Sequence, residues 1–133
     1  MNILVTGGAG YIGTPLVSSL LSQGHKVRVL DFGLYGFEQL LSFLNLPNFE
    51  LKIGDIRNDR VLFDSLSDMD VVIHLAALVG EDACNICSKA TQNINFLSVC
   101  KVLEFCTKKS NIRLIFLSTC SNYGISNKNE LAN

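Results

Sequence analysis

The chain opens with Met1-Asn-Ile-Leu-Val-Thr6-Gly7-Gly8-Ala9-Gly10-Tyr11-Ile12-Gly13. The apolar run predicts a strand, the glycines predict a tight turn, and the residues after them predict a helix. Gly7, Gly10 and Gly13 have the spacing G-x-x-G-x-x-G, in which the first glycine bends the chain, the second admits a ligand and the third allows the helix to pack. Backbone N–H groups can then approach an anion at the positive end of that helix. The stretch therefore predicts a diphosphate site.

An acidic residue follows at the distance expected for a dinucleotide site. Residues 26–31 predict a second strand, and its last residue, Asp31, lies 18 positions after Gly13, close to the spacing of about 20 at which a carboxylate binds an adenosine ribose. A carboxylate there repels a 2′-phosphate, so NAD is expected rather than NADP. Phe32 is expected to contact the same cofactor. Alternatively, Asp31 only opens the turn that follows it.

Length and charge describe a single α/β unit. The chain has 133 residues and a net charge of −1, which favours neither nucleic acid nor an anionic membrane surface as partner. Its apolar runs, such as 75–79, are too short to span a bilayer, and no basic region precedes the first strand. We therefore expect a cytoplasmic protein.

The cysteines are odd in number and suggest a reducing compartment. Cys84-x-x-Cys87 could be half of a zinc site or a redox pair, but Cys100 and Cys106 lack the spacing that would complete a zinc site. With Cys120 they make five. We expect ordinary reduced thiols and no metal.

Strand and helix patterns alternate along the chain. Further strands are expected at 49–53, 70–75 and 113–117, and helices at 14–23, 37–46, 58–67 and 88–109. Right-handed crossovers then give a doubly wound parallel sheet with strand order 3-2-1-4-5. Residues 1–125 form the predicted domain, and 126–133 form a polar tail.

The candidate functional segments all follow predicted strands. Ligands bind at the carboxyl ends of parallel strands, beside the point where the strand order reverses, here between strands one and four. Five segments are expected at that edge: the glycine turn, Asp31, Asp55-Ile56, Leu75-Ala76-Ala77 and Ser118-Thr119.

These segments resemble the ordered motifs of the extended short-chain dehydrogenase/reductases, and within them the NAD-dependent sugar-nucleotide epimerases and dehydratases. The motifs are Thr6-Gly-Gly-Ala-Gly-Tyr-Ile-Gly13, Gly54-Asp-Ile-Arg57, His74-Leu-Ala-Ala77, Asn95 and Ser118-Thr-Cys-Ser-Asn-Tyr-Gly124. The resemblance implies a Rossmann-like fold that binds NAD, and a nucleotide sugar as substrate of the parent protein.

The resemblance also implies roles for single residues in the adenosine half of the cofactor site. Tyr11 and Ile12 would lie along the pyrophosphate through their backbone groups, and Asp31 would hold the ribose. Asp55 and Ile56 would flank the adenine, with the Asp55 carboxylate facing its amino group.

Further roles follow for the middle of the cofactor. Leu75, Ala76 and Ala77 would form a narrow floor, or else simply a buried strand end. Asn95 would support the loop after strand four, or else be a solvated helix residue. Ser118 is expected beside the cofactor.

The resemblance leaves the catalytic group incomplete. Thr119 matches the hydroxyl that hydrogen-bonds the reacting oxygen, although a strand-end threonine can also cap a turn. The Tyr-x-x-x-Lys pair that tunes the base is absent, because Pro15, Gln39 and Asn127 stand four residues after the three tyrosines. We therefore expect the cofactor-binding part of a larger enzyme, truncated before the later strands and the substrate region and inactive alone.

The chain departs from the family pattern at two places, and His74 needs a separate interpretation. Ser98 replaces a glycine that usually follows Asn95, and the loop 78–84 matches only a subset of epimerase-like members. His74, on a strand, is expected to pack or cap rather than to catalyse.

Other functions stay open at this point. The chain could be a non-catalytic dinucleotide-sensing or interaction module, or a reductase of the same superfamily. The outer edge of the strand at 113–117 lacks its usual neighbour, which predicts self-association, such as a homodimer, or a disordered or displaced tail that covers the edge.

Overall fold

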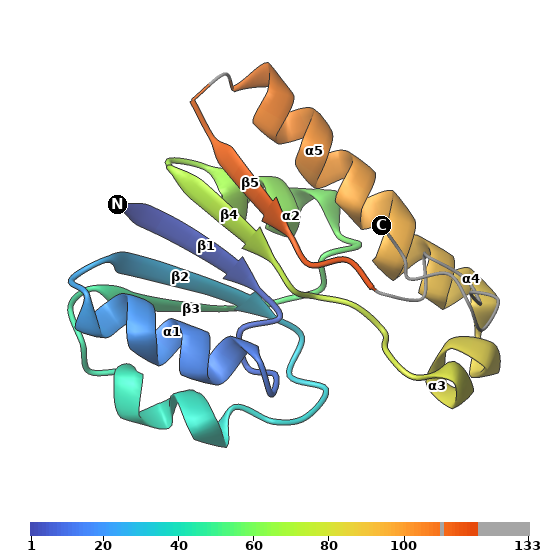
Figure 1. Ribbon diagram of the computed structural model, residues 1–133, viewed down its shortest axis with the longest axis horizontal. Helices are drawn as coiled ribbons and strands as arrows, with labels where there is room; N and C mark the ends of the chain where they lie inside the picture. Colours follow the sequence, from blue (N-terminus) through green and yellow to red (C-terminus); the bar gives the residue numbers. More distant parts are fainter. Residues whose placement is uncertain (110, 120–133) are drawn as a thin grey trace, which may run out of the picture.

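The structure, a computed structural model, describes residues 1–109 and 111–119. Its centre is a five-stranded parallel sheet in the order β3-β2-β1-β4-β5 (Figure 1). The strands are β1 (Asn2–Thr6), β2 (Lys26–Asp31), β3 (Phe49–Ile53), β4 (Val71–His74) and β5 (Arg113–Phe116). The predicted strands and their order are therefore confirmed, and the strand order reverses between β1 and β4.

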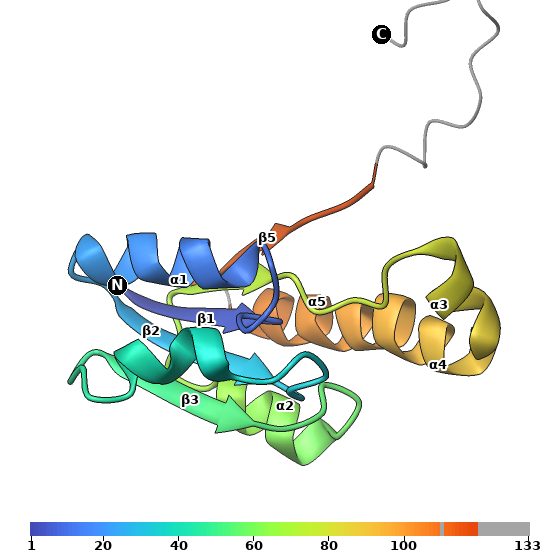
Figure 2. The same cartoon turned by 90° about the horizontal axis from the view of Figure 1, so that it is seen from below.

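Helices cover both faces of the sheet (Figures 1 and 2). One face carries α1 (Gly13–Ser22) and the 3₁₀ helix η1 (Glu38–Phe43), and the other carries α2 (Asp59–Leu66) and α5 (Ser98–Lys108). The short helices α3 (Glu81–Ile86) and α4 (Ser88–Gln92) lie beyond the carboxyl edge of the sheet, and the π-helical segment η2 (Asn93–Leu97) joins α4 to α5. No described helix is long and apolar enough to cross a membrane.

Alternation along the strands builds two cores. Ile3 and Val5 of β1 point toward α1 and η1, whereas Leu4 points toward α2 and α5. All three side chains are buried. A strand that is apolar on both faces is what a sheet between two helical layers requires, which is why the continuous apolar runs predicted the layers correctly.

The segment 37–46 differs from the α-helix that its sequence predicted. It forms a 3₁₀ helix, with hydrogen bonds from Leu40 N to Phe37 O and from Leu44 N to Leu41 O. Its period of three places Phe37, Leu40 and Phe43 against the core. Leu41 and Leu44 are exposed instead.

The long predicted helix at 88–109 is present, but it contains a π-helical turn. The segment Asn93–Leu97 adopts that conformation between α4 and α5. The helix α3 was not predicted, because its six residues are too few to display an apolar period.

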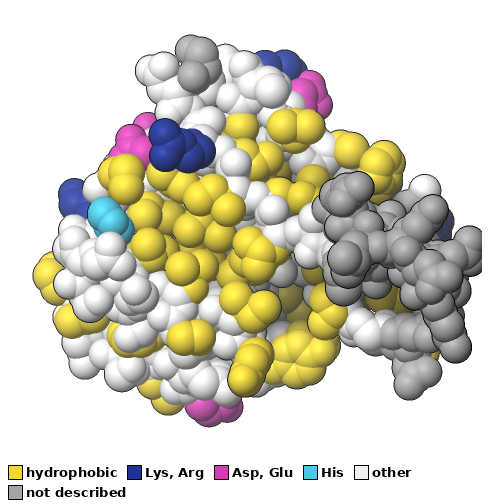
Figure 3. Space-filling model, viewed as in Figure 1, with side chains coloured by type: hydrophobic (Ala, Val, Ile, Leu, Met, Phe, Trp, Pro, Cys, Tyr) yellow, Lys and Arg dark blue, Asp and Glu magenta, His cyan; other side chains and the backbone are white. Residues whose placement is uncertain are grey.

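The face of β5 on the side of α1 has no helix over it in the described part of the chain. Ile115 pairs in register with Ile73, whose side chain belongs to the core beneath α1, yet Ile115 itself is exposed. Figure 3 shows hydrophobic side chains gathered in the middle of this face. The face is therefore apolar and accessible.

Candidate functional site

The turn between β1 and α1 is shaped by Gly7. This residue has φ +72°, a conformation that favours glycine, and a Cβ placed on it would lie 2.8 Å from the backbone nitrogen of Ala76. The turn and the chain leaving β4 are therefore in backbone contact. Only a residue without a side chain fits at this crossing.

The other glycines of the turn have different surroundings. A Cβ on Gly13 would lie 2.5 Å from the Gly7 carbonyl oxygen, so α1 packs directly on the turn. A Cβ on Gly10 would meet only that same oxygen, at 3.3 Å, and its outer side is open. Gly8, which the sequence analysis did not single out, packs against the Val29 side chain of β2, 2.7 Å from where its Cβ would be.

The N-terminus of α1 presents backbone N–H groups without a side-chain cap. Ile12 at the N-cap supplies no side-chain hydrogen bond, and the first turn has no acidic residue. The side chains of Tyr11, 98% exposed, and Ile12 point into solvent. An anion at this end would therefore meet N–H donors and the positive end of the helix dipole.

Asp31 connects the glycine turn to the loop after β2. Its carboxylate accepts hydrogen bonds from the backbone nitrogens of Ala9, at 2.9 Å, and Gly33, at 2.8 Å. Because a carboxylate can accept about four hydrogen bonds, these two contacts orient Asp31 and leave capacity for ribose hydroxyls. Both predicted roles, turn residue and ribose acceptor, are thus compatible in one side chain.

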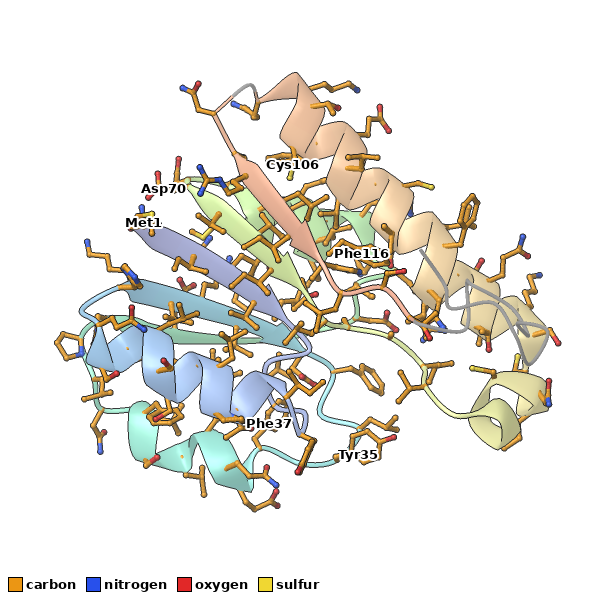
Figure 4. The ribbon with its side chains drawn as sticks, in the orientation of Figure 1. Met1, Tyr35, Phe37, Asp70, Cys106 and Phe116 are labelled. Atoms are coloured by element: carbon orange, nitrogen blue, oxygen red, sulfur yellow. The ribbon has the colours of Figure 1, made fainter. Side chains whose placement is uncertain are left out.

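The loop beyond Asp31 is rich in exposed aromatic residues. Phe32 and Tyr35 are exposed, and Figure 4 shows Tyr35 beyond the carboxyl edge of the sheet, with Phe37 turned back toward α1. Gly33 and Gly36, both at positive φ, bound the tip of the loop. Phe32 therefore lies beside Asp31 with its ring accessible to a ligand.

Asp55 and Ile56 follow β3, next to Asp31. The backbone nitrogen of Gly54 donates to the Asp31 carbonyl oxygen at 2.8 Å, which holds the two strand ends together. Asp55 is half-buried and forms an ion pair with Arg57, whose hydrogen bonds lower the pKa of the Asp55 carboxyl. Ile56 is buried in the core beneath α2.

The chain leaving β4 is held by Thr6. The backbone nitrogen of Leu75 donates to the Thr6 carbonyl oxygen at 3.1 Å, and that of Ala76 donates to the Thr6 hydroxyl at 3.3 Å. Leu75 and Ala76 are partly buried and Ala77 is exposed. This small-residue segment crosses directly over Gly7, as a narrow floor beside the turn would require.

Asn95 holds the next part of the same segment. Its side chain accepts a hydrogen bond from Leu78 N and donates one to Leu78 O, both at 2.8 Å. Cys84 Sγ also donates to that oxygen, at 3.4 Å. Asn95 lies in η2, so the π-helical turn is the part of the helix that contacts the loop. Asn95 is therefore bonded to the loop after β4 and is not a solvated helix residue.

His74 lies beneath the site and is enclosed. Its Nδ1 is 2.8 Å from the Thr6 hydroxyl, its ring faces Phe116 of β5, and its Nε2 has no protein partner among the described residues. Burial lowers the pKa of His74 from 6.5 to about 4. The packed role that the sequence predicted fits this position.

The remaining predicted residues lie at the end of β5. Ser118 and Thr119 follow the strand at the same carboxyl edge and are exposed. Tyr123 and Gly124, which set the Thr119 assignment, lie outside the described residues, as does Cys120.

The described cysteines are four free thiols, of which Cys106 is buried and has its pKa raised by that burial. Within residues 1–109 and 111–119, no cluster of three or more His, Cys, Asp or Glu side chains could hold a metal ion.

A family profile and individual relatives both place the chain among the epimerases and dehydratases. Residues 3–132 match the profile of the NAD dependent epimerase/dehydratase family. A UDP-glucose 4-epimerase of Halalkalibacterium halodurans is 39% identical over 130 residues, which are 93% of this chain and 36% of that protein. The chain therefore spans little more than a third of this relative's length.

Solved structures of a dehydratase and an epimerase have the same fold as this chain. A dTDP-glucose 4,6-dehydratase from Bacillus anthracis in complex with NAD has a TM-score of 0.84 and 29% identity, covering 100% of this chain and 42% of the other. A UDP-N-acetylglucosamine 4-epimerase from Methanobrevibacter ruminantium in complex with UDP-N-acetylmuramic acid has a TM-score of 0.86 and 28% identity. The match covers 98% of this chain and 42% of the other.

Proposed function

Because the chain belongs to the NAD dependent epimerase/dehydratase family, we propose that it forms the NAD-binding part of a nucleotide-sugar epimerase or dehydratase. One observation carries the proposal: the turn between β1 and α1 has an open side at Gly10, and the Asp31 carboxylate is fixed 2.9 Å from the Ala9 nitrogen of that turn. A diphosphate and the ribose next to it need these two groups side by side.

The proposed contacts follow the carboxyl edge of the sheet. Backbone N–H groups from Gly10 to Gly13 bind the diphosphate, and Asp31 binds the adenosine ribose, with Phe32 beside it. Asp55 and Ile56 flank the adenine. This order matches that of β1, β2 and β3 across the sheet.

The other half of the cofactor is proposed to lie across β4 and β5. Leu75, Ala76 and Ala77 form the floor under its middle, and Asn95 fixes that floor through Leu78. Ser118 borders the cofactor at the end of β5. The small side chains of Ala76 and Ala77 leave room for a ligand that passes close to the backbone.

For catalysis, we propose that the Thr119 hydroxyl hydrogen-bonds the reacting oxygen of a nucleotide sugar. When bound, NAD supplies the acceptor for a hydride from a sugar carbon. The sugar hydroxyl must also give its proton to a base, and no tyrosine of the 133 residues has a lysine four positions later. We therefore propose that these residues alone bind the cofactor without turnover.

Calorimetric titration with NAD and NADP tests the binding proposal. We expect saturable binding of NAD and weaker binding of NADP, because Asp31 repels a 2′-phosphate. Gly10→Ala should retain the fold, since its Cβ would meet only one oxygen at 3.3 Å, and should reduce NAD affinity about tenfold or more by filling the ligand side of the turn. Absence of NAD binding by the folded protein contradicts the proposal.

The missing Tyr-x-x-x-Lys pair also favours a second candidate, a non-catalytic dinucleotide-binding module. The coding sequence after Asn133 distinguishes the two. A downstream Tyr-x-x-x-Lys supports the enzyme, and a stop codon in the native gene supports the module.

We further propose that the edge of β5 associates with a second copy of the chain. Among the described strands, β5 pairs only with β4, and Ile115, Phe116 and Leu117 are exposed. An unpaired apolar edge readily pairs with another strand.

A further inference from the structure

Arg57 surrounds the carboxylate of Asp55. Its backbone nitrogen donates to Oδ1 at 2.8 Å, its Nε lies 3.0 Å from Oδ1 and 2.9 Å from Oδ2, and its Nη2 donates to Oδ2 at 2.5 Å. Both carboxylate oxygens are therefore bound by a residue two positions away. A side-on guanidinium contact of this kind fixes the plane of a carboxylate as well as its charge.

The backbone around this pair is fixed from both sides. Before it, Gly54 N is bonded to the Asp31 carbonyl oxygen at 2.8 Å. After it, Asn58 N donates to the Asp55 carbonyl oxygen at 3.0 Å, and the Asn58 side chain caps α2. With the backbone held, the direction of the Asp55 carboxylate depends on Arg57.

This ion pair differs from the others on the surface. The carboxylate side chains of Glu50, Asp59 and Asp64, which also pair with cations, are 48%, 57% and 70% exposed, whereas that of Asp55 is 26% exposed. Asp55 also directly follows Gly54, whose backbone nitrogen is bonded to the Asp31 carbonyl oxygen. Ion pairs near the surface contribute little to stability. The ordered, side-on geometry of this pair, at the edge where the cofactor is proposed to bind, therefore indicates a role in ligand recognition.

The hydrogen-bond capacity of the carboxylate limits what it can recognise. An ionised carboxylate accepts about four hydrogen bonds and donates none. Arg57 supplies three N–H groups, from N, Nε and Nη2. About one acceptor position is left, which suits a single ligand N–H.

We propose that Arg57 is a positioning residue that fixes Asp55 toward the amino group of a 6-amino purine and thereby sets selectivity against a 6-oxo purine. The inference rests on the proposed function, in which Asp55 flanks the adenine of NAD. The amino group donates to the remaining acceptor position. A 6-oxo group would instead bring a second acceptor against the carboxylate and leave both unpaired.

Calorimetry with NAD and nicotinamide hypoxanthine dinucleotide tests this assignment. We expect the protein to prefer NAD by about tenfold or more. Arg57→Met should reduce that ratio about fivefold or more, mainly through weaker NAD binding, and Arg57→Lys, which keeps the charge without the side-on contact, should be intermediate. Arg60→Met is the matched control, an exposed arginine three residues later in α2, and should leave the ratio unchanged.

The outcomes separate the two levels of the proposal. Binding of NAD with the same NAD-to-hypoxanthine ratio in Arg57→Met and wild type overturns the role of Arg57 and leaves the NAD site standing. Equal weakening of both dinucleotides also overturns it, because a purely structural role acts on both alike. Absence of NAD binding by the folded wild-type protein overturns the proposed function and this inference together.

Discussion

Lowering the pH should destabilise this protein through His74. The ring is 1% exposed, and of its two nitrogens only Nδ1 has a protein partner among the described residues, the Thr6 hydroxyl. That hydroxyl accepts a hydrogen bond from Ala76 N and can therefore give its own proton to Nδ1. The neutral ring fits this arrangement, whereas an imidazolium would be a buried charge without a counterion in contact.

The sign and size follow from the two protonation equilibria. Burial lowers the pKa of His74 from 6.5 to about 4 in the folded state, so as the pH falls through this window the unfolded chain binds a proton that the folded chain does not. The free energy of unfolding then decreases, by about 2 kcal/mol between pH 7 and pH 5 and about 3 kcal/mol by pH 4. Domains are stable by only about 5–15 kcal/mol, so the change is large.

Urea unfolding followed by circular dichroism at half-unit steps from pH 7 to pH 5 measures this dependence. Aspartates and glutamates titrate mostly below that range, so the slope reports mainly the histidines. His74→Gln should flatten the curve, and His25→Gln, which replaces the other histidine of the chain, should leave it steep. Should the His74 variant fail to fold, the wild-type ring can be followed by NMR. A His74 resonance that titrates near pH 6.5 would contradict the lowering of its pKa by burial.

Three further outcomes are expected. Gly7→Ala should lower the free energy of unfolding by at least about 2 kcal/mol, because φ is +72° and the added Cβ would meet Ala76 N at 2.8 Å; Gly10→Ala is the control, and equal stability of the two would contradict the geometry. Asn95→Leu should speed amide hydrogen exchange at Leu78 and destabilise the chain by about 1–3 kcal/mol, because it leaves the Leu78 N–H unpaired and the Leu78 carbonyl oxygen with only the weak Cys84 thiol donor; Gln92→Leu, at an exposed position three residues earlier, should do neither. Sedimentation should show concentration-dependent dimers that Ile115→Lys abolishes, and a wild-type monomer at high concentration would count against the β5 edge.

The layers and strand order could be predicted because they depend on short-range patterns. Continuous apolar runs such as Val71–His74 require cover on both faces, and glycines mark the turn after β1. The 3₁₀ helix η1 was not predicted because Phe37, Leu40, Leu41 and Leu44 have an α-helical spacing, whereas the residues that pack in the structure, Phe37, Leu40 and Phe43, have a spacing of three. The choice between the two spacings depends on packing in this core, such as the contact of Phe43 with Phe49 of β3, which local sequence does not contain.

The sequence predicted which segments lie at the carboxyl edge of the sheet, but not the contacts between their side chains. Asp31 and Asp55 were expected at one edge of the sheet because each follows a predicted strand, and Asn95 was expected to support the loop after the fourth strand because of the family resemblance. The bond from Ala9 N to Asp31, the pairing of Asp55 with Arg57, and the two bonds from Asn95 to Leu78 depend on side-chain directions across loops. Gly8 was missed because its need for a bare Cα arises from Val29, a contact 21 positions away in the sequence.

We expect a dinucleotide to lie across the N-terminus of α1. An NMR titration of the ¹⁵N-labelled chain with NAD tests it most directly. We predict the largest amide shifts at Gly10, Tyr11, Ile12 and Gly13, with further changes at Phe32 and Gly33, and none at Asn111 on the opposite edge of the sheet. Shifts centred on that opposite edge, or a glycine turn that NAD leaves unchanged at saturation, would contradict binding of the dinucleotide at this turn.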